Sequence, residues 1–168
     1  MKQYIIYLSV IVLSFSGIDA ISQNQTSTIY IVRHAEKVLD GSKDPMLTKI
    51  GFARANKLAE ILDEVALTAI YSSPYKRTRQ TAQLVATNKN LEILPYNPSM
   101  QKEFVSSVLE KHRGGNLLIV GHSNTVPGLL NIFTGTEKYQ QLADDEYDKL
   151  FIVNIDADGL VKVKVEVY

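Results

Sequence analysis

The alternation of short apolar, β-branched runs with longer segments of helical periodicity constrains the fold of this chain more than any other feature. The runs predict strands at residues 28–32, 67–71, 91–94, 117–120, 150–155 and 160–167. The helical periodicity predicts helices at residues 49–63, 75–87, 99–111 and 126–133. Strands that alternate with helices over short connections are typical of a parallel sheet covered on both faces. We therefore expect an α/β protein, a three-layer α/β/α sandwich with a mostly parallel sheet and an antiparallel edge.

Two local signals support particular elements of this fold. Thr48 offers a hydroxyl N-cap to the first predicted helix, and Gly51 is interpreted as a point of close packing. The Asp-Gly pair at residues 158–159 predicts a hairpin turn between the last two strands.

The composition excludes several classes of function. The 168 residues are 45% apolar and 21% charged, so the chain can bury a core and is not a disordered tail. Basic and acidic residues both number 18, and a chain without net charge is not expected to bind nucleic acid or an anionic membrane surface. The absence of cysteine excludes disulfides, thiolate metal sites and cysteine nucleophiles.

The first residues are interpreted as an export signal. A single lysine precedes an apolar run, residues 4–15, which is shorter than the roughly 20 residues of a membrane span, and Ala20 offers a cleavage site. We predict a signal peptide over residues 1–22, a polar tether over residues 23–28 and one folded domain over residues 29–168. The mature protein is then expected to be periplasmic or secreted, without an integral membrane span. A buried first strand or an uncleaved anchor is the alternative.

Side chains capable of chemistry gather at the carboxyl ends of three predicted strands. The first strand runs into Arg33-His34, the second into residues 72–77 (SSPYKR), and the strand at 117–120 into residues 121–124 (GHSN). Because ligands of open α/β sheets bind beyond these ends, two of the three histidines and two arginines are expected at one edge. The third histidine, His112, is interpreted as a solvated residue or one that interacts with a helix dipole.

These residue types predict a phosphate pocket with a histidine nucleophile. Two guanidinium groups can neutralise a phosphate dianion with donors that match its oxygens. A neutral imidazole can attack phosphorus, and a second, protonated imidazole can stabilise charge in the transition state. A metal site would need a third ligand such as Glu36 or Asp44, and the spacing of zinc motifs is missing, so no metal is expected. A nucleotide-binding domain is disfavoured because the chain has no glycine-rich fingerprint.

Four segments, in order along the chain, resemble the motifs of the histidine phosphatase superfamily, the phosphoglycerate mutase-like proteins. They are residues 31–37 (IVRHAEK), residues 44–48 (DPMLT) followed by Gly51, residues 71–82 (YSSPYKRTRQTA) and residues 120–125 (VGHSNT). The resemblance covers nearly all of the expected core. It implies a phosphoglycerate mutase-like fold, with a histidine phosphatase domain at residues 29–168.

The resemblance also implies roles for individual residues. His34 would be phosphorylated during turnover, Arg33 and Arg77 would bind the phosphoryl group, and His122 would be the second histidine of the family's pattern. Substrate-binding hydrogen bonds are expected from Ser123 and Asn124. Members of the family need no metal or diffusible cofactor for simple phosphatase turnover, and the implied partner is a small phosphorylated substrate. The sequence does not indicate an oligomeric state.

Two departures from the family's pattern concern the chemistry. Ala35 stands where the signature usually has glycine. The proton donor that relatives supply from the segment at residues 94–105 is not evident, because that segment holds only Glu103, within a predicted helix. The candidate acids are Glu36, Glu103, Asp144, Asp145 and Glu146.

The sequence thus predicts an exported, metal-independent phosphatase that hydrolyses phosphomonoesters, or phosphohistidine-like substrates, through a phosphohistidine at His34. One alternative is a non-catalytic phosphate-binding module that has lost its general acid. The other is a phosphoglycerate mutase-like phosphotransferase, which the short chain and the predicted export disfavour.

Overall fold

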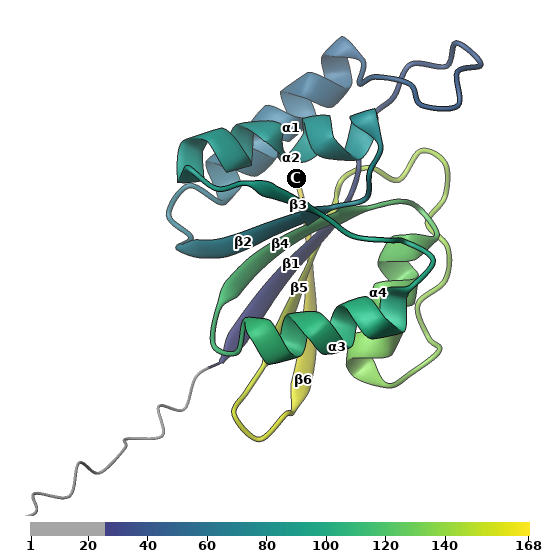
Figure 1. Ribbon diagram of the computed structural model, residues 1–168. Coiled ribbons are helices and arrows are strands. Elements are labelled where there is room, and N and C mark those ends of the chain that lie inside the picture. Colours follow the sequence, from purple (N-terminus) through teal and green to yellow (C-terminus); the bar gives the residue numbers. More distant parts are fainter. Residues whose placement is uncertain (1–25) are drawn as a thin grey trace, which may run out of the picture.

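A six-stranded sheet runs through the middle of the protein in the computed structural model, which describes residues 26–168 (Figure 1). The strand order is β3-β2-β4-β1-β5-β6. β1 to β4 are parallel, whereas β5 is antiparallel to both of its neighbours, β1 and β6. The strands are β1 Ser27–Arg33, β2 Leu67–Ser72, β3 Ile93–Pro95, β4 Asn116–Gly121, β5 Lys149–Ile155 and β6 Val161–Val167. The predicted sheet with its antiparallel edge is confirmed.

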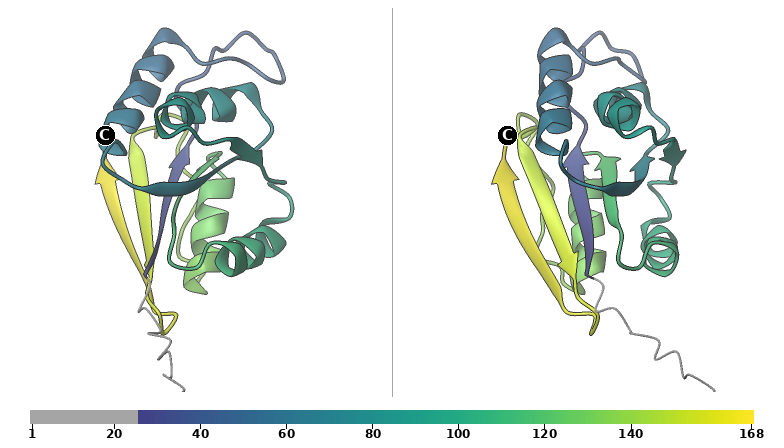
Figure 2. Two further views of the ribbon diagram at one scale, coloured as in Figure 1. Left: turned by 60° about the vertical axis from the view of Figure 1, so that its left-hand side comes forward. Right: turned by 90° about the vertical axis from the view of Figure 1, so that its left-hand side faces the viewer.

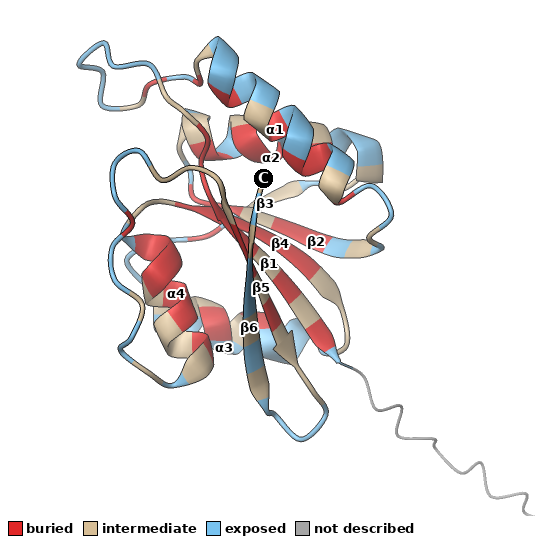
Figure 3. Cartoon of the chain, turned by 180° about the vertical axis from the view of Figure 1, so that it is seen from behind, coloured by how far each residue is buried: buried red, intermediate tan, exposed pale blue. Residues whose placement is uncertain are grey.

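Two pairs of helices cover the two faces of this sheet (Figure 2). Helices α1, Lys49–Ile61, and α2, Lys76–Lys89, pack on one face, whereas α3, Gln101–Lys111, and α4, Thr125–Thr134, pack on the other. Burial is concentrated on the inner sides of the helices and in the central strands (Figure 3). Within β1, Ile31 packs toward α3 and α4 and Val32 toward α1 and α2, which explains why successive residues of this strand are apolar at residues 29–32.

The starts of the first two helices are fixed in different ways. Thr48 is the N-cap of α1, as expected, and its Oγ1 accepts a hydrogen bond from the backbone of Gly51 at 3.0 Å. A Cβ at Gly51 would lie 2.2 Å from the backbone oxygen of Glu36, so the predicted close packing is confirmed. α2 has no side-chain cap of its own, and Asp44 supplies one from a distant loop by accepting a hydrogen bond from the backbone of Lys76 at 2.8 Å.

The predicted boundaries of several elements differ from the observed ones. Asn90 ends α2 in a left-handed conformation with φ 52°, and the backbone of Leu91 still donates to Ala86 at 3.0 Å. Leu91 therefore belongs to the helix end, and β3 begins at Ile93 rather than at residue 91. The Asp-Gly turn forms as predicted, with Gly159 at φ 82°.

Near the amino terminus, β1 begins at Ser27, inside the predicted tether of residues 23–28. Residues 1–25, which include the predicted signal peptide, lie outside the described residues. Among residues 26–168, no helix has both the length and the apolar character required to cross a membrane.

Candidate active site

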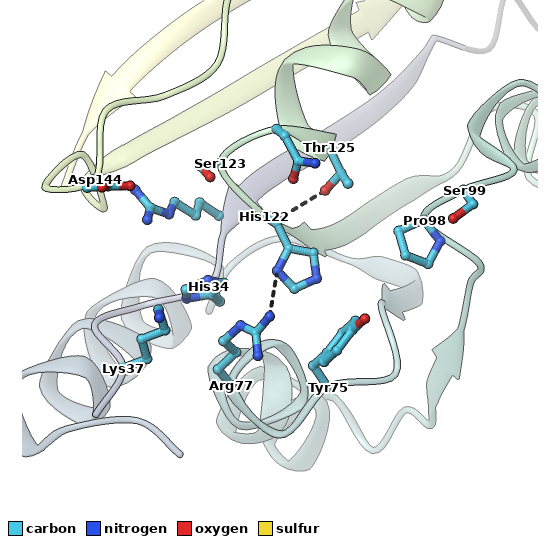
Figure 4. A pocket seen from close by; sticks show the side chains of 12 residues that line it. His34, Lys37, Tyr75, Arg77, Pro98, Ser99, His122, Ser123, Thr125 and Asp144 are labelled. Carbon is cyan, nitrogen blue, oxygen red and sulfur yellow. Dashed lines mark hydrogen bonds between the residues drawn. The ribbon is translucent and has the colours of Figure 1, made fainter. Parts of the chain in front are cut away.

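A pocket of about 440 Å³ lies beyond the carboxyl ends of β1, β2 and β4 (Figure 4). The ends converge because hydrogen bonds continue past the strands: His34 donates its backbone N–H to Gly121 at 2.9 Å, and Ser73 donates to Val120 at 3.3 Å. The pocket is lined by Arg33, His34, Lys37, Tyr75, Arg77, Pro98, Ser99, His122, Ser123, Asn124, Thr125 and Asp144. All six side chains that the sequence placed in the site are therefore brought together. The nearby Arg79 is exposed and does not line this pocket.

His34 is held with one ring nitrogen occupied and the other free for chemistry. Its Nδ1 lies 2.8 Å from the carbonyl oxygen of Ala35. Because a carbonyl can only accept, Nδ1 carries the proton and Nε2 keeps its lone pair. Burial lowers the pKa of His34 to about 3, and the nearby His122 and the guanidinium groups of Arg77 and Arg33 lower it further. The imidazole is therefore neutral at physiological pH, which is the state that a nucleophile requires.

A directed chain of hydrogen bonds fixes His122. Its Nε2 lies 2.8 Å from Ser73 Oγ, which donates to Thr78 Oγ1 at 3.0 Å, and Thr78 in turn donates to the backbone oxygen of Ser73 at 2.8 Å. Since each hydroxyl has one proton, this order makes His122 Nε2 a donor. Its Nδ1 is left unprotonated, 3.5 Å from Nη2 of Arg77. Burial lowers the pKa of His122 to about 4, with contributions from Arg77 and Arg33.

Arg33 binds the loop on one side of the pocket. The side chain is 4% exposed, and its Nη1 donates to the backbone oxygens of Ala143 at 2.7 Å and Glu146 at 3.0 Å. The guanidinium stacks on the ring of Tyr147, 4.1 Å from the ring centre. These contacts fix its position without using all of its donors.

Arg77 is fixed in a similar way on the other side. Its guanidinium lies 4.5 Å from the ring centre of Tyr75 and 3.7 Å from a carboxylate oxygen of Asp44.

Three buried guanidinium nitrogens at the pocket have no hydrogen-bond partner within the described part of the chain. They are Nε of Arg33 and both Nε and Nη1 of Arg77. A buried donor without a partner costs about 1–3 kcal/mol, and more when it is charged, so such groups are normally satisfied. Both arginines line the pocket, so a ligand with several acceptor oxygens and a negative charge would be attracted to their guanidinium groups. A phosphate dianion has both properties.

Of the five candidate acids, the structure places one at the pocket and four away from it. Glu36 lies outside the pocket, where Arg54 binds both of its oxygens, with Nη2 2.8 Å and Nε 3.0 Å away. Burial alone would raise the pKa of Glu36, but the hydrogen bonds from Arg54 lower it, so this carboxylate is held ionised. Glu146 is bound to Lys149 and, at 2.7 Å, to the backbone of Ala143. Glu103, Asp145 and Glu146 do not line the pocket, and Asp144 does.

Several features of the site were not predicted from the sequence. Lys37, Tyr75, Pro98, Ser99 and Thr125 line the pocket, and Tyr147 and Ser73 position the residues that do. The segment at residues 94–105, from which relatives supply their acid, contributes only Pro98 and Ser99.

Two further residues that the sequence singled out are Ala35, beside the predicted nucleophile, and His112, the third histidine. Ala35 is fully buried and packs with Leu47 and Ala55 rather than lining the pocket. His112 is not simply solvated, because its Nε2 is hydrogen-bonded to the hydroxyl of Tyr71 at 2.8 Å. Among residues 26–168, no group of three or more His, Asp or Glu side chains is arranged to hold a metal ion.

Comparison with known protein families identifies one match. Residues 29–97 match the model of the histidine phosphatase superfamily, branch 1. Phosphoserine phosphatase 1 of Hydrogenobacter thermophilus is 42% identical over 72 residues, which cover 39% of this chain and 34% of that protein. A protein of Escherichia coli O139:H28 named "Probable phosphoglycerate mutase GpmB" is 35% identical over 89 residues, 49% of this chain and 40% of that protein. The matches thus span only a third to two fifths of these relatives.

Solved structures with the same fold cover nearly the whole described chain. YhfR of Bacillus stearothermophilus superimposes with a TM-score of 0.69 at 22% identity, over 83% of this chain and 96% of that one. The protein histidine phosphatase SixA, solved with tungstate, gives a TM-score of 0.67 at 19% identity, over the same shares. A structure named as the phosphoglycerate mutase of Bacillus anthracis gives a TM-score of 0.69 at 16% identity, over 85% of this chain and 93% of that one. At these identities the likeness concerns the fold.

Proposed function

Because the chain belongs to the histidine phosphatase superfamily, we propose that it hydrolyses small phosphomonoesters, or phosphohistidine-like substrates, through a phosphohistidine at His34 and without a metal ion. One observation carries the proposal. The guanidinium groups of Arg33 and Arg77 line the same pocket as the unprotonated Nε2 of His34. Two cationic groups that can bind a phosphoryl group thus lie beside a nitrogen that can attack its phosphorus.

The two arginines bind and orient the phosphoryl group in this mechanism. Each guanidinium is already fixed on a tyrosine ring and by an oxygen partner, so little side-chain freedom is lost when the substrate binds. Their positive charges neutralise the phosphate dianion and keep the phosphorus in reach of His34. In phosphoryl transfer, such positioning and charge stabilisation supply most of the catalysis.

The reaction then proceeds in two halves. His34 Nε2 attacks phosphorus as the bond from phosphorus to the leaving oxygen breaks, and the alcohol departs with a proton. The hydrogen bond from Nδ1 to Ala35 keeps the ring oriented and disperses the positive charge that develops on it. Water next attacks the phosphohistidine, the nitrogen–phosphorus bond breaks, and inorganic phosphate is released.

His122 stabilises the transferring group from a second direction. Without a ligand, the charges of Arg33 and Arg77 help to keep its ring neutral. A bound dianion offsets those charges and raises the pKa of His122, so that Nδ1 takes up a proton and donates it in a hydrogen bond to a phosphoryl oxygen. The bond from Nε2 to Ser73 holds the ring in the orientation that this requires.

The pocket also favours a substrate with a second negative group. Lys37 lines the wall and forms no ion pair with any of the described residues. A carboxylate beside the phosphate, as in phosphoserine, would pair with its ammonium group. The similarity to a phosphoserine phosphatase over 72 residues is compatible with such a substrate.

Export belongs to the proposal as well and rests on the sequence of residues 1–22 alone. Cell fractionation and amino-terminal sequencing of the mature protein test it. A full-length chain recovered from the cytoplasm would contradict it.

Hydrolysis of 4-nitrophenyl phosphate in the presence of EDTA tests the proposed activity. The wild-type protein is expected to turn over, and His34→Ala to be inactive. Phosphate binding without turnover or phosphoenzyme formation would instead identify the non-catalytic module.

A further inference from the structure

We propose that Asp144 is the general acid of this site, an inference that rests on the proposed phosphatase function. The role is open because the segment at residues 94–105 presents Pro98 and Ser99 to the pocket and no carboxyl group. Expulsion of an alkoxide without a proton is slow, and general acid catalysis typically contributes about 10²–10⁴ in rate.

Asp144 is the one carboxyl group among the twelve lining residues of the described chain. In Figure 4 it lies on the opposite side of His122 from Pro98 and Ser99. The substrate would therefore receive its proton from the wall formed by the loop between α4 and β5. No feature of the local sequence marks this position, since Asp144, Asp145 and Glu146 follow one another.

The loop around Asp144 is fixed to the phosphate-binding residues. Arg33 Nη1 binds the backbone oxygens of Ala143 and Glu146, which flank Asp144 on both sides. The backbone of Leu142 donates to Ser123 at 2.9 Å, and Ser123 also lines the pocket. The arginine that receives the phosphoryl group therefore also sets the place of the acid, and Asp144 is positioned although its side chain is exposed.

The proton balance of the reaction is complete with this assignment. In the first half, His34 Nε2 forms a bond to phosphorus, the bond to the leaving oxygen breaks, and the Asp144 carboxyl proton moves to that oxygen. In the second half, the Asp144 carboxylate takes a proton from the attacking water as the nitrogen–phosphorus bond breaks. The carboxyl group is protonated again and His34 is free.

The assignment is tested with two esters of similar size and different leaving groups. 4-Nitrophenyl phosphate releases a stable phenolate, whereas benzyl phosphate releases an alkoxide that needs a proton. The variant is Asp144→Asn, and Asp145→Asn is the matched control, because it removes the same charge from the next residue, which does not line the pocket. We measure kcat/KM, which reports the steps up to departure of the leaving group.

We expect Asp144→Asn to lower kcat/KM for benzyl phosphate by about 10²–10⁴ and that for the nitrophenyl ester by less than about tenfold. Asp144→Glu should restore part of the loss, and Asp145→Asn should behave as wild type. An equal loss on both esters, or a ratio unchanged from wild type, would overturn the assignment while leaving the phosphatase function intact. If the wild-type protein hydrolyses neither ester and forms no phosphohistidine, the proposed function itself is wrong, and the assignment falls with it.

Discussion

Replacement of His34 by glutamine removes a buried titratable group, and we expect the stability of this variant to depend less on pH than that of the wild type. In the folded protein, burial lowers the pKa of His34 from 6.5 to about 3; the hydrogen bond to Ala35 opposes this shift, and His122, Arg77 and Arg33 add to it. Between these two values the unfolded chain binds a proton that the folded chain does not. The free energy of unfolding therefore falls as the pH is lowered from about 6.5 toward 3.

The size of the effect follows from the two pKa values. Each pH unit below 6.5 costs about 1.4 kcal/mol for one such group, so at about pH 5 His34 alone lowers the stability by about 2 kcal/mol. His122 contributes in the same direction, since its pKa is lowered to about 4, and it is present in both proteins compared.

Urea unfolding at about pH 7.5 and about pH 5, in buffers without phosphate, measures this difference. Wild type should lose about 2 kcal/mol more than His34→Gln between the two conditions. His112→Gln serves as a comparison for a half-buried histidine away from the pocket. Burial and the nearby Lys111 lower the pKa of His112 as well, so this variant should lose part of the pH dependence, but less of it than His34→Gln. Parallel profiles for wild type and His34→Gln would refute the view that His34 is held neutral by its surroundings.

Three further substitutions test single contacts. Ser73→Ala removes the acceptor of His122 Nε2 and should lower kcat/KM for 4-nitrophenyl phosphate about tenfold, which corresponds to one hydrogen bond of about 1.4 kcal/mol. The circular dichroism spectrum should stay unchanged, and an unchanged kcat/KM would contradict the role of Ser73 in orienting His122. Gly51→Ala places a Cβ against the backbone oxygen of Glu36 and should cost about 1–3 kcal/mol in urea unfolding, whereas wild-type stability would show that α1 can shift. Lys37→Met should raise KM for phosphoserine several-fold more than KM for the nitrophenyl ester, and equal changes would remove the argument for a second anionic group.

The strands and the six predicted site residues were accessible from the sequence for a common physical reason. Apolar β-branched runs identify buried strands, and the topology of an α/β sheet brings their carboxyl ends to one edge. Arg33, His34 and His122 directly follow or end such strands, so a one-dimensional pattern sufficed to place them together. The same reasoning explains why Thr48 could be assigned as an N-cap.

Contacts between distant segments were not accessible in this way. Arg33 binds the carbonyl oxygen of Ala143 across 110 positions of sequence, and any residue could supply that carbonyl. Asp44 caps α2 from a loop 32 residues earlier, and Asp144 differs from its acidic neighbours only in where the loop is fixed. Such features depend on the packing of loops, which no local periodicity records.

The most direct test of the central claim is to trap the covalent intermediate. The protein is mixed with a radiolabelled phosphoryl donor, quenched in alkali and digested, and the labelled peptide is sequenced. The account predicts acid-labile, alkali-stable phosphate on His34, absent from His34→Ala and unaffected by EDTA. Turnover without label on His34, or label on another residue, would contradict it.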